Sequence, residues 1–418
     1  MAVADRRALD EWRTGWPLIL TGIMGSTCVG AQVYPLGVVM KPLAAAYGWT
    51  RGEISTASTI SSFATLALST LCGMALDRFG PRRVALVGTP MCAIILCLAA
   101  FAGPAVWTWF AVWTLYAPFM VMILPIVWGA AIASHFHVSR GLALAIGLSG
   151  TGVAAAVYPP LTLWLLETFG LRGVFPGLGA FTALTLGPLV LFAFKPKPPG
   201  TPAPDPQDRG PAPAAAWGLT LREAMRTTLL WRVVLVMAVA ALTASAINLH
   251  LQSLLTDRGV TPEKAVTIVA AIGPTTLLGR GLGGVFLDRV HARWIAAISF
   301  LLPAVGCLML ANFHGAYWQG FAAASLIGFA IGIEGDLLPF LLSRYFGLRS
   351  FGAIYGLGMA IFGGGYALGP TIAGLLFDTL RSYDPFLLVI AGMLFAAGLV
   401  ALSYGRYPAR PDAAPVAA

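Results

Sequence analysis

The segment Thr276–Arg289, TLLGRGLGGVFLDR, holds an arginine inside an apolar run and ends in an acid–base pair. Arg280 is followed eight residues later by Asp288 and then by Arg289. Eight helical residues at about 1.5 Å each put Arg280 roughly 12 Å from that end, near the middle of a hydrocarbon core about 30 Å thick. A charge buried at this depth is typical of a transport pathway through a membrane.

The composition also indicates a membrane protein. Hydrophobic residues make up 58% of the chain and charged residues only 10%, whereas a soluble domain carries about 25% charged residues. All five cysteines fall in apolar runs and are interpreted as small hydrophobic side chains. We predict neither a metal site nor a cofactor. The charged, mixed N-terminus MAVADRRALDEWRTGW is unlike a cleaved signal, and we expect a cytoplasmic tail.

Apolar spans long enough to cross a bilayer, which takes about 20 residues, follow one another along the chain. In the first half they lie at about 14–40, 54–76, 84–139 (two spans with a turn at Gly103-Pro104), 141–166 and 173–194. The second half repeats the plan at about 233–256, 264–287, 294–312, 316–342, 352–377 and 385–405. The pattern therefore predicts an all-α integral membrane protein with twelve transmembrane helices in two pseudo-symmetric six-helix halves.

The domain organisation follows from a polar break between the halves. We expect an N-terminal half over 1–194, a cytoplasmic linker over 195–230 and a C-terminal half over 231–418. The linker begins with KPKPPGTPAPDPQDRGPAPAAAW (195–217), whose composition favours an extended or disordered chain, and ends in a short surface helix at about 219–228.

The distribution of basic residues predicts the orientation, because cytoplasmic segments carry the excess of Lys and Arg. With both termini inside the cell, 19 of the 26 basic residues lie on the cytoplasmic side and six lie outside, and Arg280 remains within the membrane. We therefore expect an inner-membrane protein with cytoplasmic termini. This asymmetry also accounts for the net charge of +9, and no basic patch is large enough to indicate a nucleic-acid partner.

The two halves repeat each other at a constant offset of 211 residues. The matched positions include charged residues: Gly73, Asp77, Arg78 and Arg82 correspond to Gly284, Asp288, Arg289 and Arg293. Further along, Gly141, Gly147, Gly152 and Pro159 correspond to Gly352, Gly358, Gly363 and Pro370, and Glu167-Thr168 corresponds to Asp378-Thr379. Parallel halves of this kind rock around a substrate that is held between them near the midplane.

The stretch GMALDRFGPRR (Gly73–Arg83) resembles the signature of the major facilitator superfamily, and the resemblance extends over essentially the whole chain. The resemblance places this stretch in the loop between the second and third helices. Asp77 is expected to cap or pair with a neighbouring helix end, while Arg78 and Arg82 hold the cytoplasmic face closed. Asp288 and Arg289 form the second copy of this gate. The alternative is that these arginines only set the topology.

Within the superfamily the chain resembles the branch of monocarboxylate transporters and oxalate–formate antiporters. The resemblance lies in RGLALAIGLSGTGVAAAVYPP (140–160), LLTDRGVTPEKA (254–265) and SRYFGLRSFGAIYGLG (343–358). It implies that Arg280 binds the carboxylate of the substrate. Thr276 stands where monocarboxylate transporters often have an aspartate, and no lysine follows Lys264, where the oxalate antiporters add one. A single carboxylate therefore fits better than a dicarboxylate.

Two acids are expected at the same depth as Arg280. Glu334 and Asp336 precede Arg344 by ten and eight residues, so they lie roughly 15 and 12 Å from the cytoplasmic end of their helix. Residues two apart point about 200° apart around a helix, so both cannot face Arg280. We hypothesise that one acid neutralises the empty Arg280 and that the other carries a proton, with Glu334 slightly preferred as carrier. A static salt bridge that locks the helices is the alternative.

Further polar side chains could line a central cavity. Asn248 and His250 fall on the seventh helix, Gln32 and Tyr34 on the first, and Tyr116 on the fourth. A histidine at this position could titrate or bind an anion. Packing between helices is the alternative for each of these residues.

These observations predict a secondary transporter of a small organic anion, driven by proton symport or anion exchange. Efflux of an amphipathic compound, with Arg280 in a structural role, is a second hypothesis, and a non-transporting membrane sensor is a third. An enzyme is disfavoured, because no nucleophile–base set or phosphate-binding loop is found in the sequence. The expected partners are the anion, protons and the lipid bilayer, and we expect a monomer.

Overall fold

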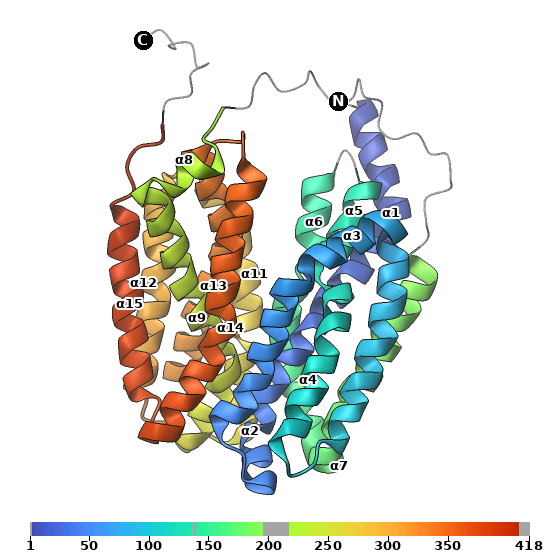
Figure 1. Ribbon diagram of the computed structural model, residues 1–418, viewed down its shortest axis with the longest axis vertical. Helices are drawn as coiled ribbons and strands as arrows, with labels where there is room; N and C mark the ends of the chain where they lie inside the picture. Colours follow the sequence, from blue (N-terminus) through green and yellow to red (C-terminus); the bar gives the residue numbers. More distant parts are fainter. Residues whose placement is uncertain (1, 137–138, 195–216, 409–418) are drawn as a thin grey trace.

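The computed structural model describes residues 2–136, 139–194 and 217–408, and its elements are helices arranged in two bundles (Figure 1). The N-terminal bundle contains α1 (Ala2–Cys28), η1 (Val29–Gln32), α2 (Tyr34–Tyr47), α3 (Arg51–Leu98), η2 (Ala99–Phe101), α4 (Val106–Met120), η3 (Val121–Ile123), α5 (Pro125–His135), α6 (Arg140–Gly147), α7 (Gly150–Pro188) and η4 (Leu189–Ala193). The C-terminal bundle contains α8 (Leu221–Met225), α9 (Thr228–Asp257), α10 (Pro262–Ala270), α11 (Ile272–Arg289), α12 (Ala292–Ala311), α13 (Tyr317–Phe346), α14 (Phe351–Leu380) and α15 (Asp384–Leu402).

Ten helical segments of the described chain are long and apolar enough to cross a membrane. One of them, Gly141–Ala193, breaks at Gly170, whose φ of 68° lies in the left-handed region that favours glycine. The helix α3 breaks in the same way at Gly80, with φ 76°, and its first part, 51–79, is rich in Ser and Thr and is not among the ten. With Gly141–Ala193 divided and this part of α3 added, twelve crossing segments result, six in each half.

Proline interrupts two of the predicted spans. The first span is divided, because α1 ends at Cys28 and α2 begins after the turn of η1 with Pro35 in its first turn. In the fourth span, α4 ends at Met120 and α5 begins at Pro125. Proline has no N–H to donate to the preceding turn, so it fits the first turn of a helix, where that N–H has no partner within the helix.

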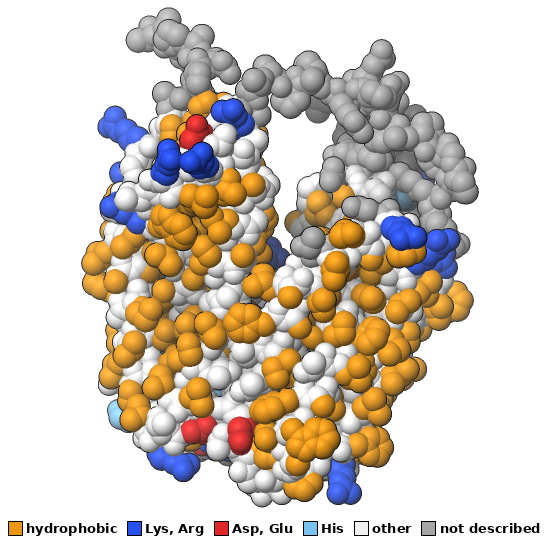
Figure 2. Space-filling model, viewed as in Figure 1, with side chains coloured by type: hydrophobic (Ala, Val, Ile, Leu, Met, Phe, Trp, Pro, Cys, Tyr) orange, Lys and Arg blue, Asp and Glu red, His pale blue; other side chains and the backbone are white. Residues whose placement is uncertain are grey.

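Each half is packed around its own hydrophobic core. The N-terminal half buries the aromatic rings of Trp109, Trp113, Trp128, Tyr116 and Tyr158 completely. In the C-terminal half, Phe300 and Phe346 are buried among aliphatic side chains. Apolar side chains cover the outer surface between the two ends of the molecule, while Lys and Arg gather at the ends (Figure 2). This distribution is that of a protein surrounded by lipid.

The halves meet through α2 against α9, α3 against α14, and α7 against α10 and α11. They lie close together at the end opposite the termini and apart at the end that carries the termini (Figure 1). Figure 2 shows a hollow between the two lobes at the end with the termini. The structure is therefore open at the end of the termini, here called the inner end, and closed at the outer end.

Candidate functional site

The site around Arg280 is built on a very close contact between α11 and α13. A Cβ atom on Gly279 would lie 2.0 Å from the carbonyl oxygen of Phe329, and one on Gly332 would lie 2.2 Å from that of Thr276. The Thr276 hydroxyl donates to the carbonyl oxygen of Gly328 on α13 at 3.0 Å. Glycines at the contact let the two backbones touch, and Thr276 thus fastens α11 to α13.

Arg280 projects from this contact with its guanidinium incompletely bonded. Its Nε lies 4.0 Å from Oδ2 of Asp336, and its side chain is 30% exposed. This separation is too long for a hydrogen bond, and the buried Nε has no hydrogen-bond partner among the described residues. A Cβ on Gly335 would lie 2.8 Å from Nη2 of Arg280, so the glycine leaves room for the guanidinium.

The two acids of α13 lie in different surroundings. Asp336 is 53% exposed beside Arg280. Glu334 is only 6% exposed and borders a cavity of about 10 Å³ inside the C-terminal half. The walls of that cavity come from α9, α12, α13 and α15, and include Ala240, Thr243, Ala244, Pro303, Ile327, Ile331 and Leu394. Within the described residues, Glu334 forms no ion pair.

Polar groups from both halves meet at the contact of α2 with α9 and α14. Tyr34 of α2 lies near Tyr366 of α14, which in turn lies beside Asn248 of α9. Among the described residues, Oδ1 of Asn248 and Oε1 of Gln32, which ends η1, are buried without a hydrogen-bond partner. Buried polar atoms left unpaired in this way are sites where a ligand or water can bind. Tyr366 was not among the residues predicted from the sequence.

Tyr116 and His250 contact residues away from Arg280. Tyr116 lies in the core of the N-terminal half, where its ring is 5.4 Å from that of Trp113 and its hydroxyl lies beside Cys92. His250 is bonded to Ser55 on α3 and to Tyr383 before α15, at the outer end of the molecule. Neither side chain adjoins Arg280 in this conformation.

The residues of the repeated gate lie at the open inner end. Arg82 donates through Nη2 to the carbonyl oxygen of Leu191, at 2.9 Å, within its own half. Arg78 is exposed and lies over the ring of Phe79, and Arg289 is also exposed. The side chains of Asp77 and Asp288 lie outside the part of the chain that the structure describes.

At the outer end, polar contacts join the halves. Both guanidinium Nη atoms of Arg51 bond Asp257, at 2.6 and 3.0 Å, and Nζ of Lys41 lies 2.7 Å from the same carboxylate. Asp378 accepts hydrogen bonds from the backbone N–H groups of Arg51 and Gly52 at the start of α3. In the sequence, Lys41 and Arg51 are two of the six basic residues expected outside, and no further role was predicted for them.

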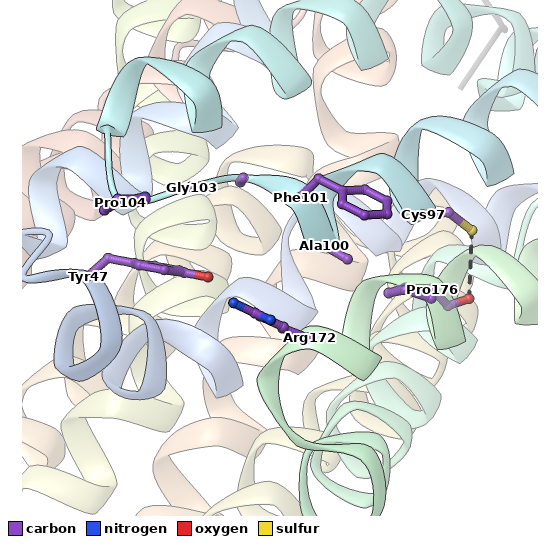
Figure 3. Close-up of a pocket in the computed structure, with 9 residues that line it drawn as sticks. Tyr47, Cys97, Ala100, Phe101, Gly103, Pro104, Arg172 and Pro176 are labelled. Carbon is purple, nitrogen blue, oxygen red and sulfur yellow. Dashed lines mark hydrogen bonds between the residues drawn. The ribbon is translucent and has the colours of Figure 1, made fainter.

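A pocket of about 660 Å³ lies at the outer end of the N-terminal half, between α2, η2 and the part of α7 after Gly170. Tyr47 and Arg172 extend toward one another across it (Figure 3). All of its lining residues belong to the N-terminal half, so it is separate from the site between the halves.

Two six-helix halves that repeat each other are the architecture of the twelve-helix carriers. The family model of the Major Facilitator Superfamily matches residues 22–351 and 233–418. The chain belongs to this superfamily and is a multi-pass membrane transporter.

Monocarboxylate transporters are among the proteins that this chain resembles in sequence. It is 25% identical to Monocarboxylate transporter 13 of Bos taurus over 389 residues, which cover 92% of this chain and 87% of that protein. It is 24% identical to Monocarboxylate transporter 11 of Homo sapiens, covering 89% and 79% of the two chains. A similar solved structure is the bacterial homologue of the human lysosomal transporter Spinster, in an inward-facing and unoccupied conformation. Its TM-score is 0.72, with 17% identity and coverage of 95% of this chain and 99% of that chain.

Proposed function

We propose that this protein carries a small monocarboxylate across the cell membrane by proton symport. The single observation that supports this most is Arg280, a half-buried cation with an unpaired Nε whose nearest acid is 4.0 Å away. A carboxylate can accept two parallel hydrogen bonds from a guanidinium, which is a strong and directional interaction. The substrate would bind Arg280 in the hollow between the halves. Its other polar partners would be Tyr34 and Gln32 from the N-terminal half and Asn248 from the C-terminal half.

Asp336 and Glu334 have separate roles in the proposal. Asp336 neutralises Arg280 when the site is empty, because it is the acid beside the guanidinium. Glu334 holds the transported proton, because burying an ionised carboxyl without a cation costs several kcal/mol and its cavity is lined mainly by apolar residues. Both termini would face the cytoplasm, so that the open end of the present structure is the cytoplasmic one. Asp77, Arg78, Arg82, Asp288 and Arg289 would close that end in the other half of the cycle.

Transport in proteoliposomes tests the proposal. Radiolabelled lactate is offered with an inward pH gradient, and uptake by the wild type is compared with uptake by Arg280→Lys. Lysine keeps the charge but not the two-pronged hydrogen bonding, which is worth about 1.5–3 kcal/mol, so we expect uptake efficiency to fall roughly 10- to 100-fold. The matched control is Arg172→Lys, an exposed arginine of the outer pocket, which should transport like the wild type.

Two outcomes would contradict this assignment. If Arg280→Lys takes up lactate as efficiently as the wild type, Arg280 does not bind the substrate. Absence of lactate uptake in both proteins, with export of amphipathic compounds by the wild type, would favour efflux instead.

A further inference from the structure

His250 is the centre of a hydrogen-bonded contact at the closed outer end. It lies on α9 and is only 3% exposed. Its Nδ1 is 2.9 Å from the hydroxyl of Tyr383, and its Nε2 is 2.9 Å from the carbonyl oxygen of Pro370 and 3.1 Å from the hydroxyl of Ser55. Ser55 belongs to the N-terminal half and the other partners to the C-terminal half, so the imidazole joins the two.

The hydrogen-bond partners of His250 show which ring nitrogen carries a hydrogen. The carbonyl oxygen of Pro370 can only accept, so Nε2 carries a hydrogen. Arg51 donates to the oxygen of Tyr383 at 2.8 Å, which leaves the hydroxyl hydrogen of Tyr383 for Nδ1. One directed chain therefore runs from Arg51 through Tyr383 and His250 to Pro370. Both ring nitrogens are satisfied in the neutral form.

The same cluster holds the outer end shut. Asp378 on α14 accepts from two backbone N–H groups at the start of α3, at 3.0 and 2.8 Å, where the helix dipole also favours a negative charge. Asp257 on α9 binds Arg51 of α3 and Lys41 of α2. We call Arg51, His250, Asp257, Asp378 and Tyr383 the outer latch.

The pseudo-symmetric contact between α7 and α10 has no equivalent of the latch. The residues 211 positions after Arg51 and Gly52 are Pro262 and Glu263. Pro262 has no N–H to donate. The carboxylate of Glu263 at this helix start would repel a second carboxylate placed there. The counterpart of the capping aspartate, Glu167, is exposed. A cavity of about 380 Å³ lies beside this contact, bordered by Leu163, Leu166 and Pro262. Polar closure of the outer end therefore rests on the α3 side.

We propose that His250 is a proton-binding site whose occupation releases the outer latch. A proton on Nδ1 displaces the hydrogen that Tyr383 donates, and it sets a second cation beside Arg51 in a closed, poorly hydrated contact. The charged groups facing the ring are Arg51 from α3 and Asp378 from α14; Asp257, one step further, is already bonded to Arg51. In the outward-open state water can hydrate the imidazolium, so His250 binds a proton more tightly in that state than in the closed one. Proton binding therefore shifts the equilibrium toward the outward-open state.

The proposal rests on alternating access between the halves, but not on the identity of the substrate. A distance measured without substrate therefore tests the role of His250 even if the proposed substrate is wrong. Spin labels are placed at Gly103→Cys and His314→Cys, in outer loops of the two halves, after the native cysteines are replaced. Electron–electron double resonance is recorded on the purified protein from pH 8 to pH 5. We expect a longer distance to appear and grow as the pH falls.

Three variants decide the result. His250→Gln should keep the short distance at every pH. The matched control His291→Gln, at the start of α12 and outside the outer latch, should respond to pH like the wild type. Arg51→Gln removes the bonds to Asp257 and Tyr383, and it should give the long distance even at pH 8. A pH response in His250→Gln equal to that of the wild type, no response in the wild type, or a closed Arg51→Gln would each overturn the proposal.

Discussion

At the scale of the residue, the candidate site depends on Arg280, whose Nε has no hydrogen-bond partner among the described residues. The two acids of α13 point apart, as residues two apart in a helix must, and Asp336 is the one beside Arg280. Which acid faces Arg280 could not be fixed from the sequence, because it depends on how α13 is rotated against α11.

Glu334 gives a prediction at this scale. If it carries the proton, Glu334→Gln mimics the protonated side chain permanently. Lactate should then no longer accumulate against its gradient when the outside is acidified, whereas exchange of labelled for unlabelled lactate should continue at a rate close to that of the wild type. Tracer uptake at outside pH values from 5.5 to 8 measures both.

Asp336→Asn is the comparison for this experiment. It removes the acid beside Arg280 and should change the affinity for lactate more than the pH dependence. Full accumulation by Glu334→Gln with an unchanged pH profile would remove Glu334 from the coupling.

At the scale of the element, glycine decides how closely helices approach. The sequence places glycines at repeated positions of the two halves, but it does not show which glycine meets which backbone. Gly332 contacts the backbone of Thr276 and Arg280 directly, whereas a Cβ on Gly364 of α14 would meet nothing within 4 Å. The same chemical change should therefore have opposite effects at these two positions.

Gly332→Ala tests this difference. The added methyl group would lie 2.2 Å from the carbonyl oxygen of Thr276, so α11 and α13 must separate. Overpacking of this kind costs about 1–3 kcal/mol, and we expect the thermal unfolding midpoint of the detergent-solubilised protein to fall by several degrees, on the order of 2–8 °C. Gly364→Ala should unfold at or above the wild-type temperature, since alanine favours the helix. Equal unfolding midpoints for the two variants would show that the close contact of α11 with α13 does not determine the thermal stability.

At the scale of the whole molecule, hydropathy and the 211-residue repeat predicted the two halves and their fold, because span length and charge asymmetry are properties of the chain itself. The outer latch was not predicted. Its members Arg51, His250, Asp257, Asp378 and Tyr383 come from separate parts of the chain, and one of its interactions uses backbone N–H groups that no side-chain pattern reveals. Tyr116, expected near a central cavity, lies in the core of its own half, where its ring packs against that of Trp113.

The measurement that tests the central claim most directly is equilibrium binding of a monocarboxylate to the purified transporter, since it does not depend on coupling or direction. Titration calorimetry with lactate is compared among the wild type, Arg280→Lys and Arg172→Lys, with a dicarboxylate as second ligand. The account predicts that lactate binds the wild type and Arg172→Lys alike, binds Arg280→Lys roughly 10- to 100-fold more weakly, and binds better than the dicarboxylate. Equal lactate affinity in Arg280→Lys and the wild type would contradict it.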